Sequence, residues 1–262
     1  MTDGLAIRDL TVGYGGNIVV SKLSLTAATT GITGLIGPNG AGKTTIFNVC
    51  SGLLRPRTGS VHLAGREVTR MSPARRAQRG LGRSFQRTEV CTAMTVRQNV
   101  EIGVEARQAG LNPLRQFVAA RGERSAVTRR VSEAIDRCGL SEHADSVVAT
   151  LPTGRRRLVE LARVLASDFS MLLLDEPSSG LDEEETAAFA QILIDTVNDL
   201  GTGILLVEHD MSLVMRVCQQ IHVIDFGTLI FSGTPAEVRA SDVVRAAYLG
   251  AELVDGIGEV AS

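Results

Sequence analysis

Residues 37–44 have the types and spacing of a loop that holds phosphate groups. They read GPNGAGKT and fit the pattern GxxxxGK[ST], between a predicted strand at 32–36 and a predicted helix at 44–51. Gly40 and Gly42 allow backbone N–H groups to close around phosphate oxygens without a Cβ clash. The N-terminus of the following helix adds a partial positive charge.

The polar side chains of this loop predict a site for a nucleotide and a metal ion. Lys43 is expected to reach the β- and γ-phosphates, and the Thr44 hydroxyl is expected to bind Mg²⁺. The alternative is a chance glycine turn, and the strand–loop–helix context argues against it. The loop residues predicted to bind ATP are Gly37, Pro38, Asn39, Gly40, Ala41, Gly42, Lys43, Thr44 and Thr45. The expected cofactors are therefore ATP and Mg²⁺.

A second candidate group is the pair of acids that follows an apolar strand at 171–174. The carboxyl ends of strands are where ligands bind in open α/β sheets. Asp175 is predicted to hold Mg²⁺, and Glu176 is predicted to polarise the attacking water as the general base. Taken alone, such acids often mark an ordinary strand end. The phosphate loop upstream favours the functional interpretation.

Three further residues have types that could complete the site. Gln86 could contact the metal ion and the attacking water, and His209 could hydrogen-bond to the γ-phosphate. Tyr14 offers an aromatic face on which an adenine ring could stack. Taken singly, they also have ordinary interpretations as a surface glutamine, a capping histidine and a turn tyrosine. Their order around the two main motifs favours the functional interpretation.

The elements that must position these residues follow from the hydrophobic patterning. Alternating segments predict strands at 5–12 and 18–25, whereas the Arg-, Ala- and Glu-rich stretch 71–140 predicts helices. The last third returns to alternating strands and helices, which predicts a mainly parallel sheet with helices on its faces. The elements expected there are a strand at 171–174, a helix at 182–200, a strand at 204–207, a helix at 211–218 and a hairpin of 221–225 with 228–231.

The most polar part of the middle stretch, residues 107–130, predicts a long inserted element of a helical lobe. Asn112, Pro113 and Gly122 interrupt it. Its arginines are interpreted as a solvated helical surface or, alternatively, as a contact surface for an anionic partner.

The composition narrows the class of protein. Of the 262 residues, 44% are hydrophobic, which is enough for a sizeable core and argues against disorder of the whole chain. The formal net charge of −2 argues against a nucleic-acid binder, which would be strongly basic. The scattered cysteines predict reduced, mostly buried thiols. Neither a signal peptide nor a membrane-spanning run of ~20 apolar residues is expected, so work at a membrane would require docking on other subunits.

The order of these motifs resembles that of the nucleotide-binding subunits of ABC transporters. Tyr14, the phosphate loop, Gln86, the acidic strand end and His209 are joined by a signature-like segment at 151–155 and a D-loop at 179–182. The resemblance is specific because all of these elements appear in the family's order.

The resemblance implies a fold and a division of the chain. The fold is an α/β P-loop NTPase with a RecA-like core, an antiparallel β subdomain and a helical subdomain. Residues 1–250 are expected to form a single ATPase domain, with a helical lobe at about 87–165. Residues 251–262 are expected to form a C-terminal tail.

The same resemblance implies an ATP-hydrolysing motor. Two such subunits, identical or different, would form a head-to-tail dimer around two ATP molecules, with Thr153 and Gly154 acting in trans and Asp182 in the D-loop. ATP binds the closed dimer better, and closure followed by opening would drive membrane permease subunits. The expected partners are these permeases, a second ATP-binding subunit and a periplasmic or extracellular solute-binding protein, with no nucleic acid. The expected location is the cytoplasmic face of the cell membrane.

The signature-like segment departs from the family's common form, LSGGQ. Pro152 stands in place of the serine, Thr153 in place of a glycine and Arg155 in place of the glutamine, whereas Gly154 remains. Thr153 could supply a hydroxyl or cap the helix predicted at 155–166. A weakened site, or one compensated by a different partner subunit, is left open.

Within the family, the chain is most similar to the ATP-binding subunits of branched-chain amino acid importers. The segment 82–88, the insertion at 107–130, the run VEHDMSLVM at 207–215 and the terminal segment 242–250 support this similarity. The expected function is uptake of a small solute, branched-chain or related amino acids. ATPases of lipid or lipopolysaccharide export are the alternative, because their tail is similar.

Two other hypotheses are disfavoured. A soluble ABC ATPase that acts on ribosomes or DNA would usually contain two sets of motifs or a long coiled coil. An inactive structural subunit would be expected to lack Lys43, Asp175, Glu176 or His209.

A surface for coupling to the membrane subunit is expected near the Q-loop. By resemblance, the region 86–97 should form part of a groove that receives a helix of that subunit. Phe85, Val90 and Met94 are its candidate contacts, and the alternative is that they belong to the core of the helical lobe.

Overall fold

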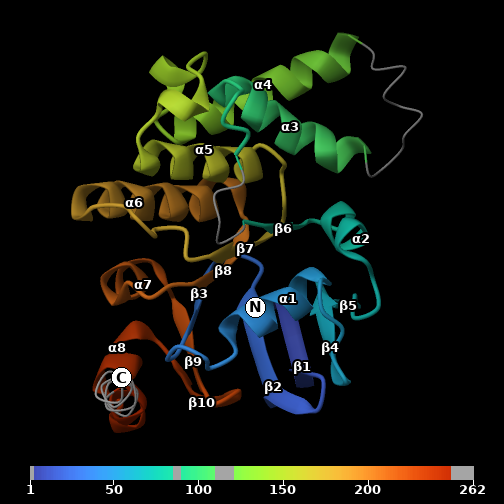
Figure 1. The fold of residues 1–262 in the computed structure, drawn as a ribbon, viewed down its shortest axis with the longest axis vertical. Helices are drawn as coiled ribbons and strands as arrows, with labels where there is room; N and C mark the ends of the chain where they lie inside the picture. Colours follow the sequence, from blue (N-terminus) through green and yellow to red (C-terminus); the bar gives the residue numbers. More distant parts are fainter. Residues whose placement is uncertain (1–2, 85–89, 110–120, 249–262) are drawn as a thin grey trace, which may run out of the picture.

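The computed structural model describes residues 3–84, 90–109 and 121–248, which form two sheets and a group of helices (Figure 1). The first sheet lies in the N-terminal part of the chain and is antiparallel throughout. Its strands, in spatial order, are β2 (Asn17–Ala28), β1 (Asp3–Tyr14), β4 (Thr58–Leu63) and β5 (Arg66–Glu67).

The second sheet is parallel except at one edge. Its strands, in spatial order, are β10 (Thr228–Gly233), β9 (Gln220–Asp225), β3 (Gly31–Ile36), β8 (Gly203–Val207), β7 (Met171–Asp175) and β6 (Leu81–Arg83). The edge strand β10 pairs antiparallel with β9, and the other neighbours pair in parallel. This mainly parallel sheet beside an antiparallel one confirms the predicted α/β fold class.

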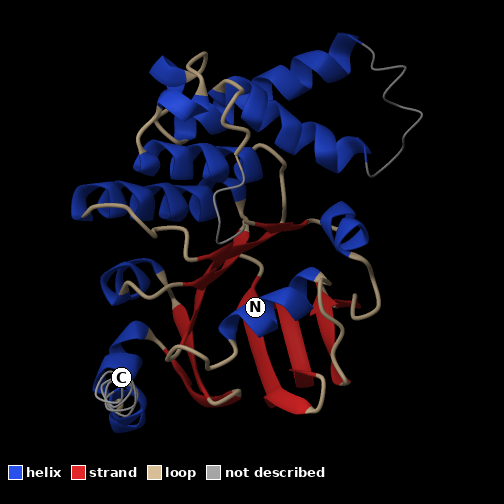
Figure 2. Ribbon diagram, viewed as in Figure 1, coloured by secondary structure: helices blue, strands red, loops and turns tan. Residues whose placement is uncertain are grey.

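The helices fall into groups that Figure 2 shows clearly. The helices α3, α4 and α5 gather at one end of the molecule, away from the antiparallel sheet. The helix bounds are α1 (Lys43–Ser51), α2 (Pro73–Gln78), α3 (Val96–Ala109), α4 (Arg121–Arg137), α5 (Thr153–Leu165), α6 (Glu183–Leu200), α7 (Met211–Val217) and α8 (Pro235–Ala240). Two short 3-10 turns, Ser141–His143 and Val148–Thr150, connect α4 to α5.

Two hydrophobic cores cover opposite faces of the parallel sheet, as the two-residue period of its strands requires. Leu172 and Leu174 of β7 belong to the core shared with the helical group, whereas Met171 and Leu173 belong to the core shared with α1 and the antiparallel sheet. All residues of β7 are buried, as expected for a parallel strand that is covered on both faces. The carboxyl end of β7 is therefore held firmly in place.

The topology brings together three loops at the carboxyl ends of strands in the parallel sheet. Strand β8 lies between β3 and β7, so the loops that follow these three strands are neighbours. They are the phosphate loop after β3, the acids after β7 and the segment 208–210 after β8. Ligands bind at this end of the strands in open α/β sheets.

Several element boundaries differ from those predicted. Strands β1 and β2 each have 12 residues and extend beyond 5–12 and 18–25, because register shifts let the hairpin continue past irregular points. Helix α5 begins at Thr153, before the predicted start at 155. The end of α3 and the start of α4 enclose residues 110–120 of the predicted insertion, which lie outside the described residues.

The three candidate coupling residues have different surroundings. Val90 is 9% exposed and belongs to the core that includes the helical lobe, whereas Met94 is 38% exposed. Phe85 lies outside the described residues. Of the two alternatives, Val90 therefore follows the core interpretation, and Met94 remains available at the surface.

Two general expectations are also resolved by the fold. Cys50, Cys138 and Cys218 are buried free thiols, and burial raises the pKa of each to about 12, while Cys91 is exposed. The prediction that the cysteines are mostly buried is confirmed. Among the described helices, none combines the length and the hydropathy that crossing a bilayer would take.

Candidate nucleotide-binding and hydrolysis site

The phosphate loop connects β3 to α1, and its glycines shape it. Gly40 (φ 80°) and Gly42 (φ 102°) have left-handed backbone conformations that other residues rarely adopt. Gly42 is the N-cap of α1, and the structure describes every residue of this helix. Its first turn contains no acidic residue, and no side chain caps it. The N–H groups at this end of α1 are therefore available to an anion.

Lys43 lies at the start of α1 and turns back into the loop. Its ammonium group donates hydrogen bonds to the carbonyl oxygens of Gly37 at 2.6 Å and Pro38 at 3.0 Å. Burial lowers the pKa of Lys43, and the nearby carboxylates of Glu176 and Asp175 oppose this shift. The sequence placed Lys43 in a phosphate site, and the structure places it beside both acids as well.

Asp175 ends β7 and is almost completely buried. Its Oδ2 atom lies 3.4 Å from a guanidinium nitrogen of Arg83. Its Oδ1 atom is buried without a hydrogen-bond partner among the described residues. Burial raises the pKa of Asp175, and the positive charge of Arg83 opposes this shift. A buried carboxylate oxygen without a partner is costly unless something else binds it.

Glu176 follows in a backbone conformation that is uncommon for a residue with a side chain (φ 50°). Its N–H donates to the carbonyl oxygen of Val207 at 2.8 Å, which fastens the turn to the end of β8. Its Oε1 atom lies 2.7 Å from Nε2 of His209. The structure thus brings together two residues that are 33 positions apart and that the sequence assigned to one site.

Glu208 is a residue of this site that the sequence interpretation missed. Its buried carboxylate accepts hydrogen bonds from the N–H of Ser178 at 2.8 Å and the N–H of His209 at 3.2 Å. Burial raises the pKa of Glu208, and the hydrogen bonds from Ser178 oppose the shift. Glu208 therefore joins the loop after β8 to the loop after β7. Its position directly between an apolar strand and His209 was the available signal.

The remaining predicted ligands of the nucleotide lie apart from this acidic cluster or outside the described residues. Tyr14 is 53% exposed at the end of β1, so its ring is available for stacking. Gln86 lies outside the described residues. The segment that leads to it passes beside Asp175, because the Ser84 hydroxyl lies 3.4 Å from the Asp175 nitrogen.

The terminal helix contacts the phosphate loop, which the sequence did not indicate. Residues 242–248 are helical, and Tyr248 packs against the larger core. Burial raises the pKa of Tyr248 to about 12, and a hydrogen bond from the Gly37 backbone opposes the shift. The two backbone polar groups of Gly37 therefore both face side chains, the N–H facing Tyr248 and the carbonyl oxygen accepting from Lys43.

The signature-like segment and the D-loop contact each other within the chain. Pro152, not Thr153, is the N-cap of α5, and no side chain caps this helix, so the predicted capping role of Thr153 is wrong. Pro152 has an extended backbone (φ −57°, ψ 159°), which makes Thr153 the first helical residue. Asp182 is the N-cap of α6 and forms a capping box with Glu185.

Gly154 lies directly against that capping box. A Cβ atom at position 154 would come within 2.1 Å of a carboxylate oxygen of Glu185. The same carboxylate accepts a hydrogen bond from the Asp182 N–H at 3.2 Å. The glycine therefore leaves room for the side chain that closes the start of α6.

We expect Gly154→Ala to displace the Glu185 carboxylate from the Asp182 N–H. Loss of a capping interaction lowers the free energy of unfolding by about 1 kcal/mol. Urea denaturation of the two proteins would measure this difference. In a Glu185→Ala background the same glycine replacement should cost little, and an equal loss in both backgrounds would contradict the proposed clash.

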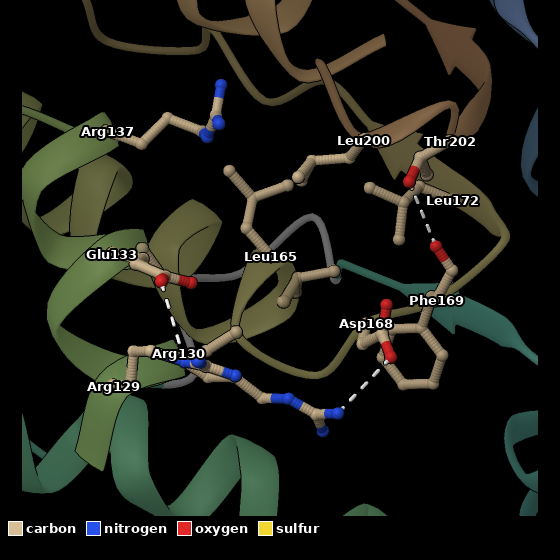
Figure 3. Close-up of a pocket in the computed structure, with 13 residues that line it drawn as sticks. Arg129, Arg130, Glu133, Arg137, Leu165, Asp168, Phe169, Leu172, Leu200 and Thr202 are labelled. Carbon is tan, nitrogen blue, oxygen red and sulfur yellow. Dashed lines mark hydrogen bonds and ion pairs between the residues drawn. The ribbon is translucent and has the colours of Figure 1, made fainter. Parts of the chain in front are cut away.

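A separate cavity of about 270 Å³ has the lining residues drawn in Figure 3. Phe169, Leu172 and Thr202 place it at the amino ends of β7 and β8, whereas the phosphate loop is at the carboxyl ends of the strands. Its rim carries three arginines, each within ion-pair distance of an acid. The pairs are Arg129 with Glu133, Arg130 with Asp168, and Arg137 with Asp199. The two arginines that belong to the polar stretch 107–130 are thus consistent with a solvated helical surface.

Known proteins share this arrangement of motifs and elements. A family model described as "ABC transporter" matches residues 20–179, and one described as "Branched-chain amino acid ATP-binding cassette transporter" matches residues 228–254. The high-affinity branched-chain amino acid transport ATP-binding protein LivG of Salmonella typhimurium is 36% identical, over 94% of this chain and 97% of that protein. The lipopolysaccharide export system ATP-binding protein LptB of Haemophilus influenzae is 33% identical over the same shares.

The fold is shared with solved structures as well. The crystal structure of the ADP conformation of an ATP-binding cassette of an ABC transporter superposes with a TM-score of 0.83. It covers 95% of this chain and 100% of that one, at 23% identity, which supports the fold. Together with the matched family model and the phosphate loop, these similarities show that the chain belongs to the ABC transporter ATP-binding family and is an ATPase.

Proposed function

We propose that this ATPase powers the uptake of a small solute, branched-chain or related amino acids, through a membrane permease. The hydrogen bond between Glu176 and His209 at the edge shared with the phosphate loop is the observation that most supports an active hydrolytic site. An inactive subunit would have no need to hold a strained Glu176 beside a histidine and a buried lysine.

The proposed chemistry divides among residues of this chain. The phosphate loop and Lys43 hold the phosphates, and the exposed ring of Tyr14 stacks on the adenine. Glu176 accepts a proton from the attacking water. His209, whose side chain is 48% exposed, can turn from Glu176 toward the γ-phosphate. Gln86 contacts the same water from the segment after β6.

The site fits a divalent cation. The buried Oδ1 atom of Asp175 has no partner among the described residues, and carboxylate oxygen is a ligand that Mg²⁺ prefers. Asp175 and the hydroxyl of Thr44, an exposed residue, would hold the ion, together with Gln86. Bound Mg²⁺ neutralises charge on the phosphate oxygens.

The assembly proposed here contains other chains. Two ATP-binding subunits, identical or different, form a head-to-tail dimer in which Thr153 and Gly154 act in trans. Thr153 is exposed at the first turn of α5, and this helix end has no side-chain cap, so it can receive an anion from a partner. The dimer docks on permease subunits at the cytoplasmic face of the membrane and works with a solute-binding protein.

Import is favoured over lipid export by the terminal part of the chain. The match of residues 228–254 to the branched-chain amino acid family model covers β10, α8 and the helical residues 242–248. LivG carries branched-chain amino acid transport in its name, and its identity exceeds that of the lipopolysaccharide-export protein LptB, 36% against 33%. The expected substrates therefore have a small apolar side chain.

Co-purification of the tagged chain from its native membranes in mild detergent tests this proposal. We expect permeases and a solute-binding protein in the complex, and we expect uptake of radiolabelled leucine to be lost in cells whose copy carries Glu176→Gln. A second, different ATPase in the complex would show a heterodimer. Recovery of a lipid-export permease instead, with unchanged uptake of leucine and related amino acids, would overturn import while leaving the ATPase intact.

A further inference from the structure

Arg83, at the end of β6, connects the helix behind the phosphate loop to the acidic end of β7. One guanidinium nitrogen, Nη1, donates to Asn48 Oδ1 at 2.9 Å and to Ser51 Oγ at 2.8 Å, both in α1. The other, Nη2, donates to Asp175 Oδ2 at 3.4 Å. The guanidinium carbon also lies 5.9 Å from the centre of the Phe47 ring. One side chain thus bridges α1 and β7.

A buried guanidinium is expensive unless its hydrogen bonds are satisfied. The Arg83 side chain is 10% exposed, and the side chain of Asp175 is 1% exposed. Burial lowers the pKa of Arg83, and the Asp175 carboxylate opposes this shift. Each partner therefore offsets part of the cost of burying the other.

A second buried arginine shows what a purely structural role looks like in this fold. Arg76 is 1% exposed and donates to the carbonyl oxygens of Val49 and Cys50, both at 2.6 Å, at the end of α1. Its other nitrogens donate to the carbonyl oxygens of Met71 and Thr69. All of these acceptors are main-chain oxygens, so Arg76 connects the end of α1 to the segment that precedes α2. Arg83 contacts the same helix, but its guanidinium group also donates to a carboxylate of the site.

The Arg83 contact distinguishes the two oxygens of Asp175. Oδ2 faces the guanidinium, and Oδ1 has no hydrogen-bond partner among the described residues. A half-turn of the carboxylate would only exchange two equivalent oxygens, but a turn out of its present plane would break the contact with Arg83. Hydrogen bonds to Asn48 and Ser51 orient the guanidinium group of Arg83, so the orientation of the Asp175 carboxylate depends on α1.

We propose that Arg83 is a positioning residue that orients Asp175 for the divalent cation and ties that carboxylate to the helix behind the phosphate loop. This inference rests on the proposed role of Asp175 in binding Mg²⁺. The planar fork is required, because a lysine ammonium is a point charge that cannot reach all three acceptors at once. The role differs from catalysis, since Arg83 acts through Asp175.

The test compares the affinity for a fluorescent ATP analogue in Mg²⁺ with that in EDTA, using the full-length chain. For the unaltered protein Mg²⁺ should tighten binding, and the ratio of the two dissociation constants measures this gain. We expect Arg83→Met to reduce the gain by about tenfold, because one misplaced charge-assisted contact is worth about that factor. Binding in EDTA should change by less than about threefold.

Two further variants separate positioning from stability and from charge. Arg76→Met removes a buried guanidinium that contacts the same helix, α1, but that donates to main-chain oxygens instead of Asp175. It should therefore lower the thermal stability but keep the gain from Mg²⁺. Arg83→Lys retains the charge and is the milder replacement if Arg83→Met does not fold. It should still lose most of the gain, because the fork is absent.

The outcomes are distinct. The positioning role would be overturned if Arg83→Lys and folded Arg83→Met kept the full gain in affinity from Mg²⁺. It would also be overturned if Arg76→Met lost as much of this gain as Arg83→Met. If the unaltered protein binds the analogue but shows no gain from Mg²⁺, the proposed cation site of Asp175 fails, and the inference falls with it. If the unaltered protein does not bind the analogue at all, the proposed function itself is wrong.

Discussion

ATP hydrolysis by the Glu176→Gln protein is expected to be about 100- to 10,000-fold slower than by the unaltered protein, the range that a general base contributes. The amide keeps the shape of the side chain but cannot accept a proton from water. Nucleotide binding should persist, because the phosphate loop and Lys43 are unchanged. With ATP and Mg²⁺ present, the variant should therefore accumulate as a closed dimer. Phosphate release and size-exclusion chromatography would measure the two effects.

The matched control is Glu183→Gln, which removes a carboxylate from the first turn of α6 that has no proposed part in the reaction. Its turnover should stay close to that of the unaltered protein. Normal turnover in Glu176→Gln would show that another group activates the water. A loss of ATP binding in the variant would instead show that Glu176 supports the loop rather than the reaction.

Replacement of Lys43 by alanine is expected to weaken ATP binding about 10- to 150-fold, since a hydrogen bond to a charged group contributes about 1.5–3 kcal/mol. Hydrolysis should fall below detection, because the γ-phosphate loses its main positive contact. Isothermal titration calorimetry of the variant would give the affinity. The reason lies in the position of the ammonium group, which is 2.6 Å from the Gly37 carbonyl inside the loop.

The sequence itself supplies the control for this experiment. The chain contains two lysines, Lys43 and the exposed Lys22. Lys22→Ala changes the net charge equally and should bind ATP like the unaltered protein. Wild-type turnover in Lys43→Ala, with a correctly folded chain, would remove Lys43 from the phosphate site.

Features encoded in short segments could be predicted from the sequence. The phosphate loop, β7 and the hairpin of β9 with β10 each have their pattern within a few residues, and the structure contains all three. The sequence also assigned Glu176 and His209 to one site through the order of the motifs, but their contact arises because β7 and β8 are neighbours in the sheet.

The partners of buried charged side chains could not be predicted in this way. Arg83 and Asp175 are 92 positions apart, and Glu208 and Ser178 are 30 apart. Such pairings depend on the order of strands in the sheet and on side-chain directions, which periodicity does not specify. The capping role predicted for Thr153 is wrong for a local reason, since the extended backbone of Pro152 makes Thr153 the first residue of α5, two residues before the predicted start.

The glycine that remains in the signature-like segment has a consequence for how this segment can evolve. Gly154 is buried against Glu185 of its own chain, whereas Pro152, Thr153 and Arg155 are exposed. Exposed side chains at these three positions can contact a partner surface, so the residues there can follow that surface. Drift at Gly154 would disturb the subunit itself. The fold of the subunit therefore constrains this glycine directly, whatever the segment contacts across an interface.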